Sequence, residues 1–143
     1  DEYLISFGKN YCEAFLSNHK FSNAGKKWRD NTLRCLQETL VPIIPLEAGK
    51  TCDCASVKTF AYSSHVACYT QPTASACDLP IADIQLIATT IIFDKVFISL
   101  MKEYKEGYKQ VKVVLEACST TAKEEQTRQK WGFYLKLIKG KVE

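Results

Sequence analysis

The chain has 143 residues, a length typical of one domain, with 46% hydrophobic and 24% charged residues, enough apolar material for a single core. The formal net charge of +3 is mild and no run of five like charges occurs, so the composition gives no reason to expect a nucleic-acid partner. No stretch of about 18 apolar residues is present, which argues against a membrane span.

The first half of the chain carries three segments with the apolar spacing of amphipathic helices. The first covers 3–18 and places aromatic residues at helical intervals. The second covers about 24–41, and Ser22 or Asn23 is a candidate cap for it. The third covers about 53–70.

The second half continues the helical pattern. A long, partly β-branched stretch predicts two helices, over 81–92 and 95–117, with a bend or break between them. The motif Thr121-x-x-Glu124 is the pattern of a capping box and predicts a last helix that ends near Gly140. No strand alternation or hairpin signal interrupts these segments, so the sequence predicts one all-α domain over 1–143, a bundle of about five helical segments.

Seven cysteines accompany only two histidines, and most cysteines are separated by wide gaps. They are Cys12, Cys35, Cys52, Cys54, Cys68, Cys77 and Cys118. Zinc sites need closely spaced Cys-x-x-Cys pairs or Cys/His sets, so disulfides that staple separate helices are the better interpretation. Disulfides predict a secreted, extracellular protein. Because the count is odd, one thiol is free or joins a second chain, which leaves monomer and dimer open.

Residues with the arrangement of a catalytic or metal site are not found. His65 lies three residues before Cys68 and is a weak candidate for a Cys/His pair, and His19 lies among polar residues. No EF-hand loop, His-Glu-x-x-His motif or phosphate-binding glycine pattern occurs. We therefore expect a binding protein without enzymatic activity, metal or cofactor, whose aromatic stripes form the core or line a groove for a lipid or a partner helix.

Much of the chain, about 10–135, resembles the stanniocalcin family. The order of cysteines and of short motifs carries the likeness: Cys12-x-x-Phe15-Leu16, Lys20-Phe21, Gly25-Lys26-x-Trp28, Leu33-x-Cys35-Leu36, Cys54, Cys68-Tyr69, Cys77 and Val114-Leu115-Glu116-Ala117-Cys118. Stanniocalcins are secreted helical glycoprotein hormones associated with calcium and phosphate balance, and members inhibit an extracellular metalloprotease. The resemblance implies a secreted signalling or inhibitory protein that acts on a receptor or another extracellular protein.

The resemblance also implies a disulfide pairing, Cys35–Cys68 and Cys77–Cys118. The family's N-terminal cysteine-rich segment has no counterpart here, so we expect Cys12 to pair with Cys54 or Cys52. Cys52 is then the expected free or intermolecular thiol. The family's glycosylation site and its dimer-linking C-terminal cysteine are also absent from this sequence, which puts the covalent dimer and the protease-trapping role in doubt.

Several functions stay open at this level. A partner-binding ligand predicts an exposed surface, for which Lys26, Lys27, Trp28 and Arg29 are the candidates. A lipid- or small-hydrophobe-binding protein predicts an enclosed apolar cavity beside the stretch 87–98. A secreted effector of a parasite or microbe built on this scaffold is a third alternative.

Overall fold

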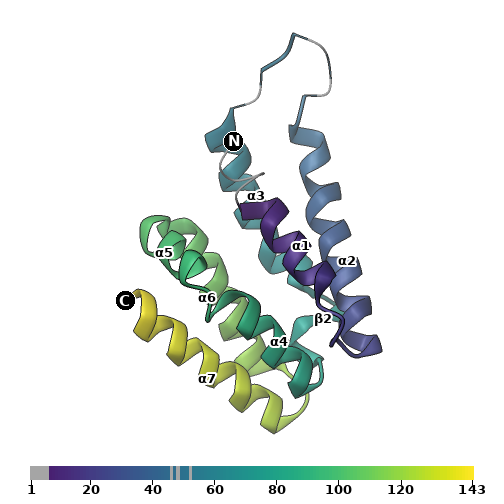
Figure 1. Cartoon of the computed structure of the whole chain (residues 1–143), viewed down its shortest axis with the longest axis vertical. Helices are drawn as coiled ribbons and strands as arrows, with labels where there is room; N and C mark the ends of the chain where they lie inside the picture. Colours follow the sequence, from purple (N-terminus) through teal and green to yellow (C-terminus); the bar gives the residue numbers. More distant parts are fainter. Residues whose placement is uncertain (1–6, 46, 48, 52) are drawn as a thin grey trace.

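The structure, a computed structural model, describes residues 7–45, 47, 49–51 and 53–143, and within these ranges the chain is predominantly helical (Figure 1). The prediction of an all-α fold is confirmed. In chain order the elements are α1 (Asn10–Ser17), α2 (Asn23–Leu40), the short 3-10 helix η2 (Val41–Ile43), α3 (Cys54–Tyr69), strands β1 (Thr70–Gln71) and β2 (Ala74–Ser75), the 3-10 helix η3 (Ala76–Asp78), α4 (Ile81–Ile91), α5 (Lys95–Glu103), α6 (Lys105–Thr121) and α7 (Glu125–Val142).

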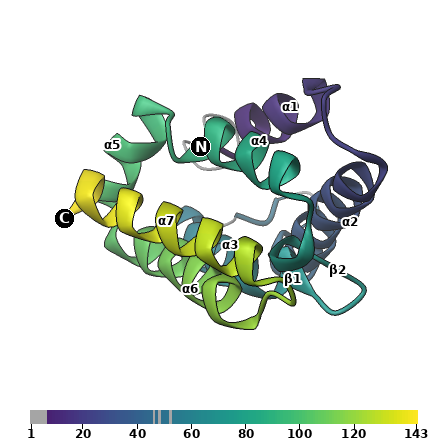
Figure 2. The same ribbon diagram turned by 90° about the horizontal axis from the view of Figure 1, so that it is seen from below.

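The helices form two layers, which Figure 2 shows in edge view. In one layer α3 packs against both α2 and α6, and α6 packs against α7, so the four helices lie in the order α2, α3, α6, α7. The other layer consists of α1, α4 and α5, which cover one face of the first. The buried apolar side chains lie between the two layers, because each amphipathic helix turns its apolar stripe inward.

Two disulfides staple the first layer. Cys35–Cys68 joins α2 to α3, and Cys77–Cys118 joins η3 to α6. Both are the pairings that the stanniocalcin-like pattern implies. The expected Cys12–Cys54 bridge is wrong, because both residues carry free thiols.

The bridge cannot form because the two thiols lie near opposite ends of α3. Cys54 is exposed at the first residue of α3, whereas Cys12 lies on α1 beside the region of His65 and Tyr69 near its other end. A rise of 1.5 Å per residue separates positions 54 and 65 by about 16 Å along the helix axis, too far for a disulfide. The expected free thiol, Cys52, lies outside the described residues.

The start of α2 is locked to α4 by a buried carboxylate. Ser22, one of the two predicted caps, is the N-cap of α2, because its hydroxyl accepts a hydrogen bond from the Gly25 amide at 3.1 Å. The backbone amide of Ser22 donates to Oδ1 of Asp83 at 2.9 Å, and the Ser22 hydroxyl donates to Oδ2. Asp83 is only 1% exposed, so this contact joins the two layers through the core.

The predicted break near 93 is confirmed. α4 ends at Ile91, and α5 begins after Asp94, whose carboxylate caps it by accepting from the amides of Val96 and Phe97 at 2.7 and 3.1 Å. Within the described ranges no helix alone is long and apolar enough to cross a bilayer. The pair α4 and α5 has sufficient length and apolar character together, but the pair is bent by 68°.

The prediction of one helix over 95–117 is wrong, because the chain breaks at Tyr104 into α5 and α6. This residue leaves the helical conformation, with φ −106° and ψ 88°. Its ring packs against Tyr62 at 4.8 Å between centroids, and Nζ of Lys58 lies 4.4 Å from its centroid. An aromatic pair of this kind stabilises a fold by about 1 kcal/mol. Keeping one residue in a helix is worth a free energy of similar size, so the packing of the Tyr104 ring can offset the break.

The capping box predicted at Thr121 is also wrong. Thr121 is the last residue of α6, and its hydroxyl donates to the carbonyl of Ala117 at 2.7 Å, while α7 begins at Glu125 without a side-chain cap. Instead, Asp78 accepts a hydrogen bond from the backbone amide of Lys123 at 2.9 Å and fixes the α6–α7 turn to η3. The helix also continues past the predicted end near Gly140, to Val142.

A short hairpin with two residues in each strand is another feature that the sequence did not predict. β1 and β2 pair antiparallel, with Thr70 opposite Ser75 and Gln71 opposite Ala74. The hairpin reverses the chain after α3 and carries it to η3.

Candidate ligand-binding cavity

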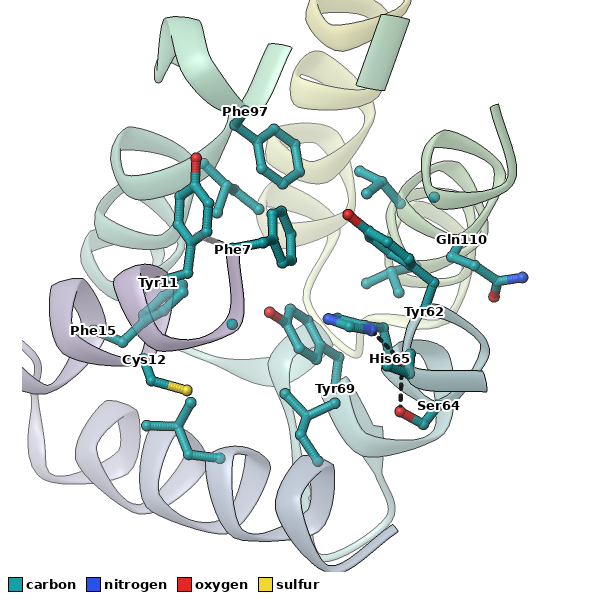
Figure 3. Close-up of a pocket in the computed structure, with 18 of the residues that line it drawn as sticks. Phe7, Tyr11, Cys12, Phe15, Tyr62, Ser64, His65, Tyr69, Phe97 and Gln110 are labelled. Carbon is teal, nitrogen blue, oxygen red and sulfur yellow. Dashed lines mark hydrogen bonds between the residues drawn. The ribbon is translucent and has the colours of Figure 1, made fainter. Parts of the chain in front are cut away.

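A cavity of about 370 Å³ lies between the two layers, with walls contributed by each α-helix of the described residues and by their connections (Figure 3). Its lining is mostly aliphatic and aromatic and includes Phe15, Leu33, Ile87, Ile91, Ile92, Phe97, Val114, Leu115 and Trp131. Four of these residues belong to the stretch 87–98, beside which a lipid-binding protein was expected to have its cavity. The two lining residues that are exposed to solvent, Lys9 and Gln37, place the opening between the start of α1 and α2.

One end of the cavity is closed by interlocked aromatic rings. Phe7 lies 4.8 Å from Tyr11 and 5.3 Å from Tyr62, between ring centroids, and Tyr11 meets Phe97 edge to face at 5.7 Å. The rings come from the α1 region, α3 and α5, so packing between the layers, rather than any single helix, forms this wall. Burial and the nearby Asp94 carboxylate raise the pKa of Tyr11 to about 12, so its hydroxyl keeps its proton at neutral pH.

His65 is the principal polar group of the α3 wall. Its ring lies between those of Tyr62 and Tyr69, at 5.6 Å from each. Nδ1 lies 2.8 Å from the carbonyl oxygen of Ala61. A carbonyl can only accept, so Nδ1 carries the proton and donates it. Burial lowers the pKa of His65, and the imidazole is therefore neutral at pH 7.

Tyr69 and Cys12 complete the polar lining in the same space. Figure 3 shows the Tyr69 hydroxyl and the Cys12 sulfur directed into the cavity from opposite walls. Burial raises the pKa of Tyr69, with a further contribution from Cys12, and burial followed by Glu13 raises the pKa of the Cys12 thiol. Both groups are therefore protonated and uncharged at neutral pH.

The charged lining residue lies at the rim. Nζ of Lys9 lies 3.9 Å from Oε1 of Glu13, and both side chains are more than half exposed. The cavity that the described residues line is therefore mostly apolar and free of formal charge in its interior, and it carries a few uncharged hydrogen-bonding groups.

Only some of the residues expected to form a partner-binding surface are exposed to solvent. Lys26 and Lys27 are exposed, but Trp28 is 2% exposed and belongs to the core. Its indole nitrogen donates to the backbone carbonyl of Tyr69 at 3.2 Å, and its ring meets the Tyr69 ring edge to face. The Arg29 side chain is 12% exposed and pairs with Asp30 at 2.9 Å. Trp28 therefore supports the cavity wall from behind and cannot anchor a partner.

The weak candidate for a Cys/His pair, His65 with Cys68, is also excluded. Cys68 belongs to the disulfide with Cys35, so it cannot supply the thiol of a Cys/His pair. No group of three His, Cys, Asp or Glu side chains within the described part of the chain is placed to hold a metal ion. The sequence analysis did not assign the cavity-facing roles of Tyr69 and Cys12, because Tyr69 was noted only beside Cys68 and Cys12 was expected in a disulfide.

No protein-family model matches this chain, and searches of curated proteins and of solved structures also find no match. Function is therefore inferred from the cavity itself.

Proposed function

We propose that this protein binds a small apolar molecule in the cavity between its two helical layers and acts outside the cell as a carrier or buffer for it. The single observation that supports the proposal is the cavity: about 370 Å³, walled by apolar side chains from both layers. Pockets that take small molecules measure about 300–1,000 Å³ and combine apolar walls with a few polar groups.

The energetics of an empty cavity favour occupancy. Protein interiors are close-packed and rarely leave voids larger than a water molecule. Because this cavity opens at its rim, its apolar walls are in contact with water when no ligand is bound. A ligand that covers these walls gains about 25 cal/mol for each Å² of apolar surface removed from water.

The extracellular setting is supported by the two intramolecular disulfides, which persist in oxidising compartments. A signalling role, as the stanniocalcin-like pattern implies, with the candidate surface at Lys26–Arg29, stays an alternative. We favour the carrier because Trp28, the aromatic anchor that such a surface would need, is buried.

Titration with N-phenylnaphthylamine, an uncharged probe that fluoresces in apolar surroundings, tests the proposal. We expect saturable binding at one site. Cys12→Phe should weaken it at least about tenfold, because a ring in the cavity displaces the equivalent of two or more methylenes at about 0.8 kcal/mol each. Cys54→Phe, the same replacement at the exposed free thiol, is the matched control and should leave the affinity unchanged.

Two results would contradict the proposal. One is the absence of saturable binding to a protein that has been stripped of co-purified lipid and is still folded by circular dichroism. The other is an equal effect of Cys12→Phe and Cys54→Phe, which would place the probe on the surface.

A further inference from the structure

His65 and Tyr69 present a hydrogen-bond acceptor and a hydroxyl to the cavity, in a fixed arrangement on α3. Because Nδ1 of His65 donates to Ala61, Nε2 of the neutral ring carries a lone pair and can only accept. Nε2 is directed toward the cavity beside the Tyr69 ring (Figure 3). Among the described residues, the hydrogen bond of the His65 ring is made by Nδ1, so Nε2 and the Tyr69 hydroxyl are left to face the cavity.

Both groups are held in position before any ligand arrives. The Ala61 carbonyl and the stacked Tyr62 ring fix the imidazole, with an interplanar angle of 25° between the two rings. Trp28 fixes Tyr69 through its bond to the Tyr69 carbonyl and its edge-to-face contact, at 5.6 Å between centroids. Pre-organised groups of this kind give specificity because a ligand loses little free energy in ordering them.

Three other polar side chains of the lining, Ser64, Gln110 and Cys12, do not compete for the ligand. Ser64 donates its hydroxyl to the Ala61 carbonyl at 2.7 Å, and the amide of Gln110 is directed away from the centre of the cavity. The thiol of Cys12 is only a weak hydrogen-bonding group. The Tyr11 hydroxyl is engaged by the Asp94 carboxylate. Among the groups described here, Nε2 of His65 and the Tyr69 hydroxyl therefore retain hydrogen-bonding capacity for a ligand.

This pattern discriminates between classes of apolar ligand. A hydroxyl can donate to Nε2 and at the same time accept from Tyr69, so it satisfies both groups. A carboxylate can only accept, and it would place a charge opposite a lone pair in a cavity whose cation, Lys9, lies at the rim and is paired with Glu13. A pure hydrocarbon would leave both groups without partners.

We propose that the ligand is a lipid alcohol, an uncharged molecule with a long apolar body and one hydroxyl that binds between Nε2 of His65 and the hydroxyl of Tyr69. This inference rests on the proposed function, since it names the class of ligand that the same cavity takes. The lowered pKa of His65 supports it, because the ring remains an acceptor at neutral pH.

Competition against N-phenylnaphthylamine with ligands of equal chain length tests the inference on the unaltered protein. At mildly alkaline pH we expect dodecanol to displace the probe at a concentration at least about tenfold lower than ionised dodecanoate does. Cholesterol in a parallel arm distinguishes a ring-shaped from a chain-shaped alcohol, and tighter binding than dodecanoate by either alcohol supports the inference.

Two variants assign the individual bonds. His65→Phe keeps a ring of similar size and removes the acceptor, so it should weaken dodecanol about three- to tenfold and leave dodecyl methyl ether, which cannot donate, unchanged. Tyr69→Phe removes the donor and should weaken both ligands. Equal effects of His65→Phe on alcohol and ether would overturn the assignment of Nε2.

The outcomes separate this inference from the proposed function. Binding of dodecanoate as tight as that of dodecanol overturns the lipid-alcohol inference and leaves a carrier of apolar molecules in place. Failure of the probe and of every competitor to bind overturns both.

Discussion

Gly25 is the position where a single methyl group tests the link between the two layers. It is the third residue of α2, and a Cβ built on it would lie 2.7 Å from Cγ of Asp83 and 2.8 Å from both carboxylate oxygens. The backbone of Gly25 does not have the positive φ that favours glycine, so alanine can adopt its conformation. Only the close approach of Asp83 excludes a larger residue.

The magnitude of Gly25→Ala follows from opposing terms. Alanine gains up to about 1 kcal/mol of helix propensity over glycine. Overpacking costs about 1–3 kcal/mol, and moving the Asp83 carboxylate weakens its hydrogen bonds from Ser22, each worth about 1.5–3 kcal/mol. We expect a net loss of about 2 kcal/mol or more in the free energy of unfolding.

Urea denaturation followed by circular dichroism measures this loss, with two controls. Gly140→Ala, where a Cβ would meet nothing within 4 Å, should stabilise the protein slightly. In an Asp83→Ala background Gly25→Ala should lose its cost, because the clashing carboxylate is gone. A stabilising effect of Gly25→Ala in the unaltered background, similar to that of Gly140→Ala, would refute the packing described here.

Three further predictions concern the disulfide and the cavity groups. Replacing both Cys77 and Cys118 with Ala should lower the free energy of unfolding by about 4 kcal/mol, as chain entropy gives for a loop of 41 residues, and a loss below about 1 kcal/mol in urea denaturation would contradict it. Burial lowers the pKa of His65, so the unfolded chain takes up a proton at higher pH than the native chain does. The melting temperature should therefore fall as the pH drops below about 6.5, and His65→Phe should reduce this fall. The same pH profile of the melting temperature in His65→Phe and in the unaltered protein would argue against a buried neutral His65. Bound dodecanol should slow alkylation of Cys12 but not of the exposed Cys54 in site-resolved mass mapping, and equal protection of both would place the ligand elsewhere.

The helical architecture could be predicted because it depends on local patterns. Apolar spacing, the Ser22 cap and the β-branched stretch before Asp94 act over a few residues, and the structure follows them closely. The break at Tyr104 could not be predicted, since it depends on contacts with Tyr62 and Lys58 that lie more than forty positions away. The capping box at Thr121 failed for the same reason, because Asp78 supplies a tertiary contact that competes with it.

The candidate site was predictable in class but not in composition. Aromatic residues at helical spacing fit a core and a ligand cavity equally well, and only the arrangement of the two layers decides between them. Trp28 illustrates the opposite error. Its basic neighbours in the sequence predicted an exposed surface, but its ring is buried in the core beside Tyr69. Volume that is left unfilled between helices has no signature in the order of residues along one helix.

The most direct test of an apolar ligand cavity is an isotope-filtered nuclear Overhauser spectrum of labelled protein with unlabelled dodecanol. Contacts from the alkyl chain to Ile87, Phe97 and Trp131, which belong to three different helices, are the predicted result. Contacts confined to exposed side chains such as Leu16 and Phe133, at a dodecanol concentration that saturates the shift changes, would contradict the account.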